Sequence, residues 1–387
     1  MSRMEYAVRF NEIHPGAAYI NRTDSNVQEQ VLQVKSEYPN HHLILRTMND
    51  VNIEDYINSG FIEFRRTYEQ DIETDDLIEF VSAYKYNDAF ITFSLDDALI
   101  KKSYEVYQQT HKANPVKEMS LEEWKTHLIP DLDYDHSIVI KDKEMIVAYL
   151  LMYDAGDSSK DIGYIYYRDN ESKEKLYSML YMKLIRLKEL SIKEISLEVD
   201  NTDRYAYDFF ESILIHSDTY MRTLILSEQV EGITIKPIDM TQVVYLYEWS
   251  KDREFCISND WPQEQSIQDI SKWWSNVINT QSDSFQRQTI YYKNLMIGYY
   301  DIVHYDDNII ELGIAIGERN AREVGLGSLI FSKITQEISY RYPNKNIVGI
   351  TRHSNLPAQR MMIKSGYVRQ NDLRETKAGE LTFSYVT

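Results

Sequence analysis

Hydrophobic and polar residues follow two distinct patterns along this chain, and their order predicts the fold. The strand-like regions, which alternate or run continuously apolar, are 136–154, 160–168, 233–237, 288–305 and 309–317. The helix-like regions, with apolar residues three and four positions apart, are 95–109, 120–129, 240–250 and 266–278. Polar turns at Lys141–Lys143 and Lys293–Asn294 divide the two longest strand regions into hairpins. Strands mixed in this way with helices predict an α+β fold of mixed sheets flanked by helices.

A strand, helix, strand pattern recurs three times, which predicts tandem copies of one unit. Near the end of the chain, "KNIVGITRHSNLPAQRMMIKSGYVRQ" predicts a strand at 347–351, a helix from Asn355 and a helix-ending turn at Gly366. The three copies share an asparagine eleven residues before the final turn, in the pairs Asn49 with Gly60, Asn201 with Ser212, and Asn355 with Gly366. The phasing predicts a half unit over 1–75, holding only helix, strand, helix, strand, a degenerate unit over 76–228 and a complete unit over 229–387.

Composition narrows the classes of partner. Lys and Arg number 42 against 61 Asp and Glu, and a formal charge of -19 argues against a nucleic-acid partner. No apolar stretch reaches the roughly 18–20 residues of a membrane span, and the first residues lack the apolar core of a signal peptide, so we expect no membrane partner and a cytoplasmic location. The single Cys256 is expected to be a buried apolar residue. We expect no metal site, because the adjacent His41 and His42 point to opposite faces of a strand.

The run "AREVGLGSLIF", residues 321–331, places two glycines just before a helical pattern. Backbone N–H groups at a helix start are unpaired and carry the positive end of the helix dipole, so a glycine-rich entry can hold phosphate oxygens. The run is not a P-loop, because no Gly-Lys-Ser/Thr follows, and it lacks the third small residue and the distant acid of a dinucleotide fingerprint. A Gly-x-Gly sequence alone is equally consistent with a tight turn.

Its context resembles the Gcn5-related N-acetyltransferase family. Arg322, Gly325 and Gly327 match the family's Arg/Gln-x-x-Gly-x-Gly/Ala loop, which follows the strand "IIELGIAI" and precedes "NLPAQRMMIKSGYV". The resemblance covers about 231–387 and is greatest to the branch of ribosomal-protein and polyamine acetyltransferases. It implies acetyl-CoA as co-substrate. The residues that it implies for cofactor binding are Leu312, Ile314, Ala315, Ile316, Arg322, Glu323, Val324, Gly325, Leu326, Gly327, Ser328, Asn355 and Ala358.

The middle unit lacks the glycine loop. It has "YYRDNESKEKLYSML" at the matching place, where Asp169, Glu171 and Glu174 would repel a pyrophosphate. We therefore expect one cofactor molecule per chain.

The resemblance also implies a catalytic arrangement. Family strands before the loop carry a bulge whose N–H groups meet the cofactor, and family members with a glutamate base carry it where Glu311 stands. We predict Glu311 as the base that takes the proton of the amine, directly or through water, since a carboxylate on an apolar strand is costly without a partner or a role. The alternative is a solvated strand charge. Asn355 is expected to bind the pantetheine arm or a water, to cap the last helix, or both. Met362 stands where many members have a tyrosine acid, so the acid is unassigned.

Acceptor residues are expected ahead of the glycine loop, where Asp252, Glu254, Asp260 and Trp261 would suit an ammonium group. Exposed helix-end charges and a core tryptophan are the alternative. The sequence thus predicts an acetyl-CoA-dependent N-acetyltransferase acting on a primary amine, either a small cationic molecule or a peptide N-terminus. A non-catalytic acyl-CoA-binding regulator and a scaffold are the alternatives, and the oligomeric state is left open.

Overall fold

The computed structural model describes residues 6–23, 26–84, 93–214, 217–306, 308–322, 324–370, 377 and 379–386. Its strands are β1 Val8–Phe10, β2 Ala17–Ile20, β3 His42–Met48, β4 Ile62–Glu73, β5 Ile138–Asp142, β6 Met145–Asp154, β7 Ser159–Tyr167, β8 Glu194–Asp200, β9 Met221–Leu226, β10 Ile233–Pro237, β11 Phe285–Tyr292, β12 Leu295–His304, β13 Ile309–Ile316, β14 Asn346–Arg352, β15 Tyr367–Gln370 and β16 Glu380–Tyr385.

The helices are interspersed among these strands, as the apolar spacing predicts. They are α1 Val27–Glu37, α2 Glu54–Asn58, α3 Thr74–Val81, α4 Asp97–Thr110, α5 Leu121–Leu128, α6 Asn170–Glu189, α7 Arg204–Leu214, α8 Glu228–Glu231, α9 Val243–Ser250, α10 Arg253–Ser258, α11 Ile267–Thr280, α12 Leu326–Arg341 and α13 Leu356–Lys364, with short 3-10 turns at 82–84, 240–242 and 319–321. Within the described parts of the chain, no helix combines the length and apolar character that crossing a bilayer requires.

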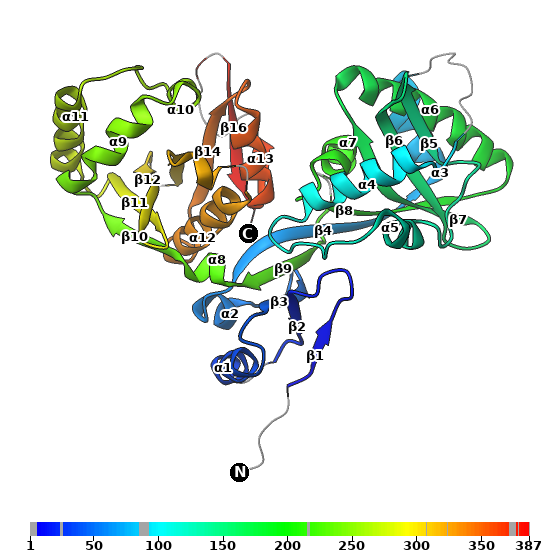
Figure 1. The fold of residues 1–387 in the computed structure, drawn as a ribbon, viewed down its shortest axis with the longest axis horizontal. Coiled ribbons are helices and arrows are strands. Elements are labelled where there is room, and N and C mark those ends of the chain that lie inside the picture. The colour runs from blue at the N-terminus through cyan, green and yellow to red at the C-terminus, as the bar shows by residue number, and fades with distance from the viewer. Residues whose placement is uncertain are drawn as a thin grey trace, which may run out of the picture.

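Two mixed sheets organise the molecule, so the predicted α+β class is confirmed. The first has the order β1-β2-β3-β9-β4-β8-β7-β6-β5, and the second β10-β11-β12-β13-β14-β16-β15. Parallel pairs occur at β2–β3, β7–β8 and β13–β14, each joined by a helix that crosses over the sheet. In Figure 1 the second sheet and its helices lie at the left, and the nine-stranded sheet extends from the lower centre to the right.

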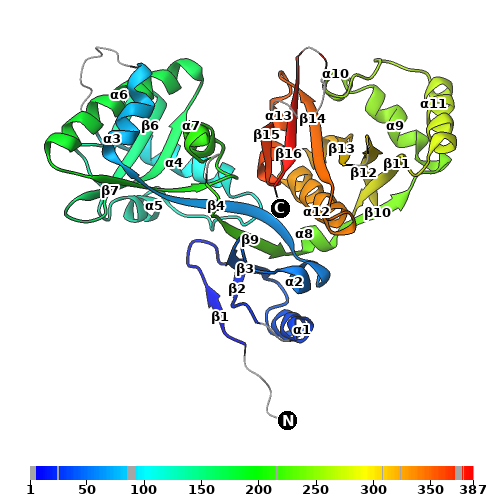
Figure 2. The ribbon, with the colours of Figure 1, turned by 180° about the vertical axis from the view of Figure 1, so that it is seen from behind.

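The first sheet is continuous across residue 75, because two strands are shared between its halves. β9 ends the middle unit in sequence, yet it lies between β3 and β4 of the N-terminal segment. The long β4 in turn pairs with β8 of the middle unit over Thr67–Glu73. Figures 1 and 2 show β4 running from the middle unit down into the N-terminal part. The N-terminal segment also contains β1 and β2, which the hydrophobic pattern did not predict.

Both faces of the second sheet are covered by helices. The even-numbered residues of β13, such as Leu312, face α12 and α13 in one apolar cluster. Ala315 faces the other way, into an aromatic cluster under α9, α10 and α11. Cys256 belongs to this second cluster and is fully buried, which confirms its expected apolar role.

The α12 helix lies between the two sheets. Its Ile330 and Phe331 pack on the second sheet, whereas the neighbouring Leu329 packs on Ile44 and Ile62 of the first sheet. A hydrogen bond from the Gln336 side chain to the Glu63 carbonyl, 3.3 Å long, adds to this contact. The first sheet therefore fixes the position of the helix that follows the glycine loop.

Candidate active site

The parallel strands β13 and β14 separate after a short paired stretch. Residues 309–311 pair with residues 346–348, and the pairing ends there. β13 continues to Ile316 and β14 to Arg352, but their carboxyl ends are not hydrogen-bonded to each other. Ligands of sheets with parallel strands commonly bind beyond the carboxyl ends of the strands, at such a separation. We call this feature the strand separation.

Glu311 is the last paired residue of β13 before the strand separation, and it is half-buried. It lies opposite Val303 on β12 and Val348 on β14. Four positions along, Ala315 and its partner Tyr299 face α9, α10 and α11. Alternate residues of a strand share a face, so Glu311 lies on the α10 side of the sheet. The predicted base thus stands where the two strands part, on the face that carries the predicted acceptor residues.

The resemblance implies a bulge in this strand, and this expectation is wrong for its pairing with β12. The register between β12 and β13 runs without a shift from Gly298 opposite Ile316 to His304 opposite Ile310. Backbone groups become available by another route, because β13 has no strand partner on its β14 side beyond Glu311.

The glycine loop forms an uncapped helix start. Gly325 is the N-cap of α12 and has a left-handed backbone, with φ 85°, which favours glycine. Gly325 has no side chain to cap the helix, and the N–H groups of the first turn, at Leu326, Gly327 and Ser328, have no intrahelical acceptor. Gly327 does not owe its identity to packing, because a Cβ there would only meet Ile316 and Met361 at 3.9 Å. The absence of that Cβ leaves room for a ligand close to the backbone.

The Arg322 side chain turns away from this helix start. Its guanidinium donates to the carbonyls of Ile316 and Gly317, over distances of 3.0 and 2.5 Å, and pairs with Asp252 at 3.0 Å. The guanidinium also lies over the Phe255 ring. Arg322 therefore closes the end of β13 and ties it to α10, and anion binding at the loop falls to backbone N–H groups.

The other residues that the resemblance implies for cofactor binding divide between the two sides of the sheet. Leu312, Ile314, Ile316 and Leu326 lie in the apolar cluster under α12, and Ala315 lies in the cluster under α10. Val324 is exposed. Glu323 lies outside the described residues.

Asn355 begins the last helix. Its side-chain carbonyl accepts the N–H of Ala358 at 3.2 Å, which confirms the predicted cap of α13. The amide of the same side chain donates to the carbonyl of Ser258 in α10 at 3.4 Å. The buried Met362 packs against Gly349 of β14 and places no hydroxyl at this point.

The four predicted acceptor residues differ in how far their side chains are already bound to other residues. Asp252 caps α10. Burial alone would raise the pKa of its carboxyl, but the N–H of Phe255 and the Arg322 guanidinium lower it below the usual value. Asp260 pairs with Arg352 at the end of β14, with 2.6 Å between nitrogen and oxygen. The half-buried Trp261 packs on Phe255, Trp273 and Tyr299.

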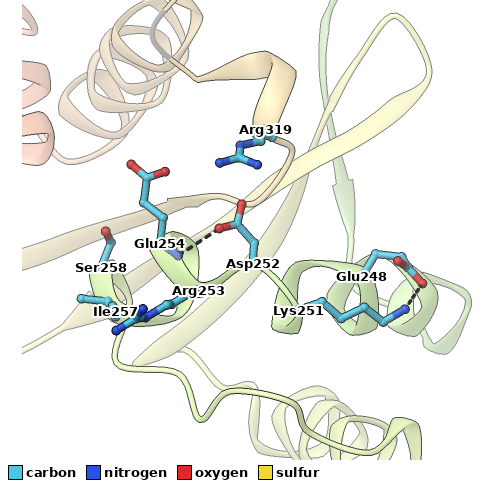
Figure 3. Close-up of a pocket in the computed structure, with 8 residues that line it drawn as sticks. All are labelled: Glu248, Lys251, Asp252, Arg253, Glu254, Ile257, Ser258 and Arg319. Atoms are coloured by element: carbon cyan, nitrogen blue, oxygen red, sulfur yellow. Dashed lines mark hydrogen bonds and ion pairs between the residues drawn. The ribbon is translucent and has the colours of Figure 1, made fainter.

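Glu254 and Asp252 line an open pocket of about 690 Å³ on α9 and α10. Figure 3 shows the Arg319 guanidinium above the Asp252 carboxylate, and Glu248 paired with Lys251 at the other end. Glu311 and the glycine loop are not among the residues that line it. The pocket therefore marks the outer side of α10 and not the strand separation.

The middle unit closes its matching helix start by its own side chains. Asp169 caps α6 in a reciprocal box with Ser172, accepting the Ser172 N–H at 2.9 Å. The Arg168 guanidinium and the Ser172 N–H hold the pKa of the Asp169 carboxyl at about 2. A carboxylate thus occupies the place where an external anion would bind.

Two neighbours of the site were not predicted. Lys112 comes from the middle unit, and its Cβ would lie 3.6 Å from a Cβ built on Gly325. Arg352 links β14 to the predicted acceptor Asp260. No local pattern could have revealed Lys112, because it is more than two hundred residues from the loop in sequence.

No protein-family model matches the sequence, and no curated protein matches it. Among solved structures, the chain is similar to the microcin C7 self-immunity acetyltransferase MccE in complex with acetyl-CoA and AMP, at 18% identity and a TM-score of 0.36, over 41% of this chain and 93% of that one. It is similar to the aminoglycoside acetyltransferase AAC(6')-Ib in complex with coenzyme A, at 18% identity and a TM-score of 0.34, over 39% and 92%. It is also similar to the ribosomal alpha-N-protein acetyltransferase RimL in complex with coenzyme A, at 15% identity and a TM-score of 0.35, over 40% and 94%.

Proposed function

We propose that the protein is an acetyl-CoA-dependent N-acetyltransferase, with its site in residues 229–387. One observation carries the proposal: the strand separation between β13 and β14 leads to an uncapped helix start at Gly325. Together these two features offer an extended ligand an unpaired strand edge and, at one end of it, a group of N–H donors.

The described residues fit the cofactor. The N–H groups at the start of α12 suit the pyrophosphate, and the free edge of β13 over 312–316 suits the amide-bearing pantetheine arm. When bound, acetyl-CoA supplies an acetyl group activated as a thioester. We assign the phosphate contacts to the backbone of 324–328, because the Arg322 guanidinium is already engaged.

Glu311 takes the proton of the amine in this proposal. An amine attacks only when neutral, so a base beside the reacting atoms raises the reactive fraction. The position of Glu311, where the strands part and on the α10 face, suits this role. The Asn355 side-chain carbonyl already caps a helix, and its amide, which has a second N–H besides the one donated to Ser258, remains our candidate for a pantetheine or water contact.

We propose a primary amine as acceptor, either a small cationic molecule or a peptide N-terminus. Among the described residues, Glu254 forms no ion pair, whereas Asp252 and Asp260 are both paired with arginines. Glu254 is therefore the predicted acceptor residue most available to an ammonium group, with Asp252 and Asp260 placing the wall that it stands on.

Calorimetry with CoA tests the proposal. Gly325→Asp adds a Cβ and a negative charge where N–H groups meet phosphate, so it should abolish CoA binding. Gly16→Asp is the matched control, because it adds the same group in open space. Unchanged CoA affinity in Gly325→Asp would contradict the cofactor assignment. Thiol release with a panel of polyamines, aminoglycosides, amino acids and peptides then tests catalysis and identifies the acceptor.

An acyl-CoA-binding regulator is the second candidate function. It is favoured by Met362, which provides no proton donor for the departing thiolate. CoA binding without thiol release from acetyl-CoA, for any amine of the panel, would establish this alternative.

A further inference from the structure

The junction between the middle unit and the proposed cofactor site gathers cations from both sides. The side-chain amide of Asn201 donates to the carbonyls of Ile363 and Lys364, over 2.9 and 3.4 Å, so the start of α7 abuts the end of α13. Figures 1 and 2 both show α7 and α13 facing each other above β4. The cations are Lys112, Arg204, Arg360 and Lys364, which we call the junction cluster.

Like charges in the junction cluster act on one another. Burial and the nearby charges of Lys112, Arg204 and Arg360 lower the pKa of Lys364 to about 8, although Asp203 opposes them. Arg360 and Lys364 are also four residues apart on α13, where like charges repel.

Local helix electrostatics explain only part of this arrangement. Lys364 ends α13, and a cation is favourable at a helix C-terminus. Arg204 is the first residue of α7, and a cation is unfavourable at a helix N-terminus. The adjoining Asp203 is the favourable partner there, since its carboxylate accepts the N–H groups of Tyr205 and Ala206. The Arg204 guanidinium donates to the Tyr205 hydroxyl and lies over the Tyr205 ring, and among the described residues it forms no ion pair, so its charge suits an anion that is supplied from outside.

Lys112 connects the junction cluster to the glycine loop. It follows α4 of the middle unit, and its Cβ would be in van der Waals contact with a Cβ at Gly325. In CoA the phosphorylated nucleotide lies beyond the pyrophosphate, away from the thioester. A ligand with its pyrophosphate at the start of α12 can therefore extend its nucleotide toward Lys112.

We propose that the junction cluster binds the phosphomonoester on the nucleotide of the cofactor, so that the middle unit supplies Lys112 and Arg204 to a site in the third. This inference rests on the proposed function. A phosphomonoester carries nearly two negative charges at neutral pH, and several cations around one such group bind it more strongly than a single pair. The middle unit, whose own helix start is closed by Asp169, would then act as the second half of one cofactor site.

Comparison of CoA with dephospho-CoA, which lacks only that phosphomonoester, tests the inference by calorimetry. The wild-type protein should bind CoA at least about tenfold more tightly than dephospho-CoA. Lys112→Ala and Arg204→Ala should each reduce this preference and leave dephospho-CoA affinity unchanged. Both side chains are exposed, so the variants should fold. Lys101→Ala is the matched control, because Lys101 lies on α4 roughly 15 Å from Lys112. This variant should keep the full preference for CoA.

Two further measurements probe the charge balance. Asp203→Asn keeps the helix cap but removes the opposing carboxylate, so it should increase the preference for CoA. The lowered pKa of Lys364, about 8, leaves part of its population neutral near that pH, and an arriving phosphate raises the pKa again, so CoA binding near pH 8 should take up protons. Calorimetry in two buffers of different ionisation enthalpy measures that uptake, which should vanish with dephospho-CoA and in Lys364→Met.

The possible outcomes separate the two proposals. Equal binding of CoA and dephospho-CoA by the wild type would overturn the inference alone, as would a preference that the Lys112 and Arg204 variants retain. Failure of both ligands to bind would overturn the proposed function and the inference with it.

Discussion

At the scale of single residues, a sequence motif specifies position more reliably than contact. The motif places Arg322 at the glycine loop, where an arginine suggests a direct phosphate ligand. In the structure its guanidinium donates to two carbonyls at the end of β13 and pairs with Asp252. The two carbonyls belong to the backbone at the end of β13, whereas Asp252 is 70 residues away, at the start of α10. No local sequence pattern links these partners to Arg322, so the sequence could not predict them. The predicted cap by Asn355 succeeded because capping is a local interaction.

Glu311→Gln tests the base at this scale. Glutamine keeps the size of the side chain but cannot accept the proton of the amine, so turnover at neutral pH should fall by about 10²-fold or more. CoA affinity should hardly change, because the proposed phosphate contacts are at the start of α12. The acidic limb of the pH–rate profile should disappear, and activity should partly return at high pH, where neutral amine is abundant.

The control for this variant is Glu337→Gln, which removes a carboxylate that pairs with Lys333 along α12. It should keep normal turnover and the normal pH profile. If Glu311→Gln behaves like this control, Glu311 is a strand charge, and proton removal passes to water or to the residues of α10.

At the scale of elements, the same strand, helix, strand unit ends in two different helix starts. α12 begins at a glycine with free N–H groups, whereas α6 begins at Asp169, whose carboxylate fills that place. The sequence shows this difference directly, because capping residues and glycines are local signals. The pattern of hydrophobic residues likewise predicted most helices and strands of the middle and third units.

Asp169→Ala tests whether the middle unit binds cofactor. Loss of the cap should destabilise α6 by about 1 kcal/mol, and CoA stoichiometry should remain one per chain, because this helix start has no glycine entry. The folded carboxyl has a pKa of about 2, below its unfolded value. Its contribution to stability is therefore present above about pH 4 and is lost as the pH falls toward 2. Thermal unfolding against pH measures the loss, and a second bound CoA would refute the expectation.

Elements that depend on distant partners escaped prediction. β1 and β2 have only three and four residues, too few to show a period. The exchange of β4 and β9 pairs residues such as Ile62 and Ile225, which are far apart in sequence. Apolar alternation shows that a strand has a buried face, but it does not identify the neighbouring strand.

At the scale of the whole molecule, the first sheet and the proposed catalytic unit share a packed interface. Leu329 and Gln336 of α12 contact the first sheet, and Lys112 lies beside Gly325. The three-part division of the chain remains a prediction about its repeats, while the contacts join those parts through α12 and β4. We infer that the position of α12 depends on residues from all three.

The interface can be tested through Arg66 of β4. Its guanidinium is almost completely buried, pairs with Glu63 at 2.5 Å and donates to the carbonyl of Val386 at 2.7 Å. It also lies between the rings of Tyr220 and Tyr385, so it joins the first sheet to the last strand of the second.

Arg66→Met should reduce the free energy of unfolding by about 3–5 kcal/mol, because Glu63 is left buried without its closest partner. The matched control is Arg46→Met on β3 of the same sheet, which removes an exposed arginine 3.9 Å from Glu198 and should cost at most about 1 kcal/mol. Denaturant unfolding is followed by tryptophan fluorescence in a Trp124→Phe background, because Trp124 packs in the core of the first sheet. The remaining tryptophans, Trp249, Trp261, Trp273 and Trp274, pack in the cluster under α9, α10 and α11, so the signal reports the second sheet. If the two sheets unfold together, the Arg66 change in the first sheet must shift this signal. An unchanged midpoint in Arg66→Met, or a loss no larger than that of Arg46→Met, would show that the two sheets are energetically independent.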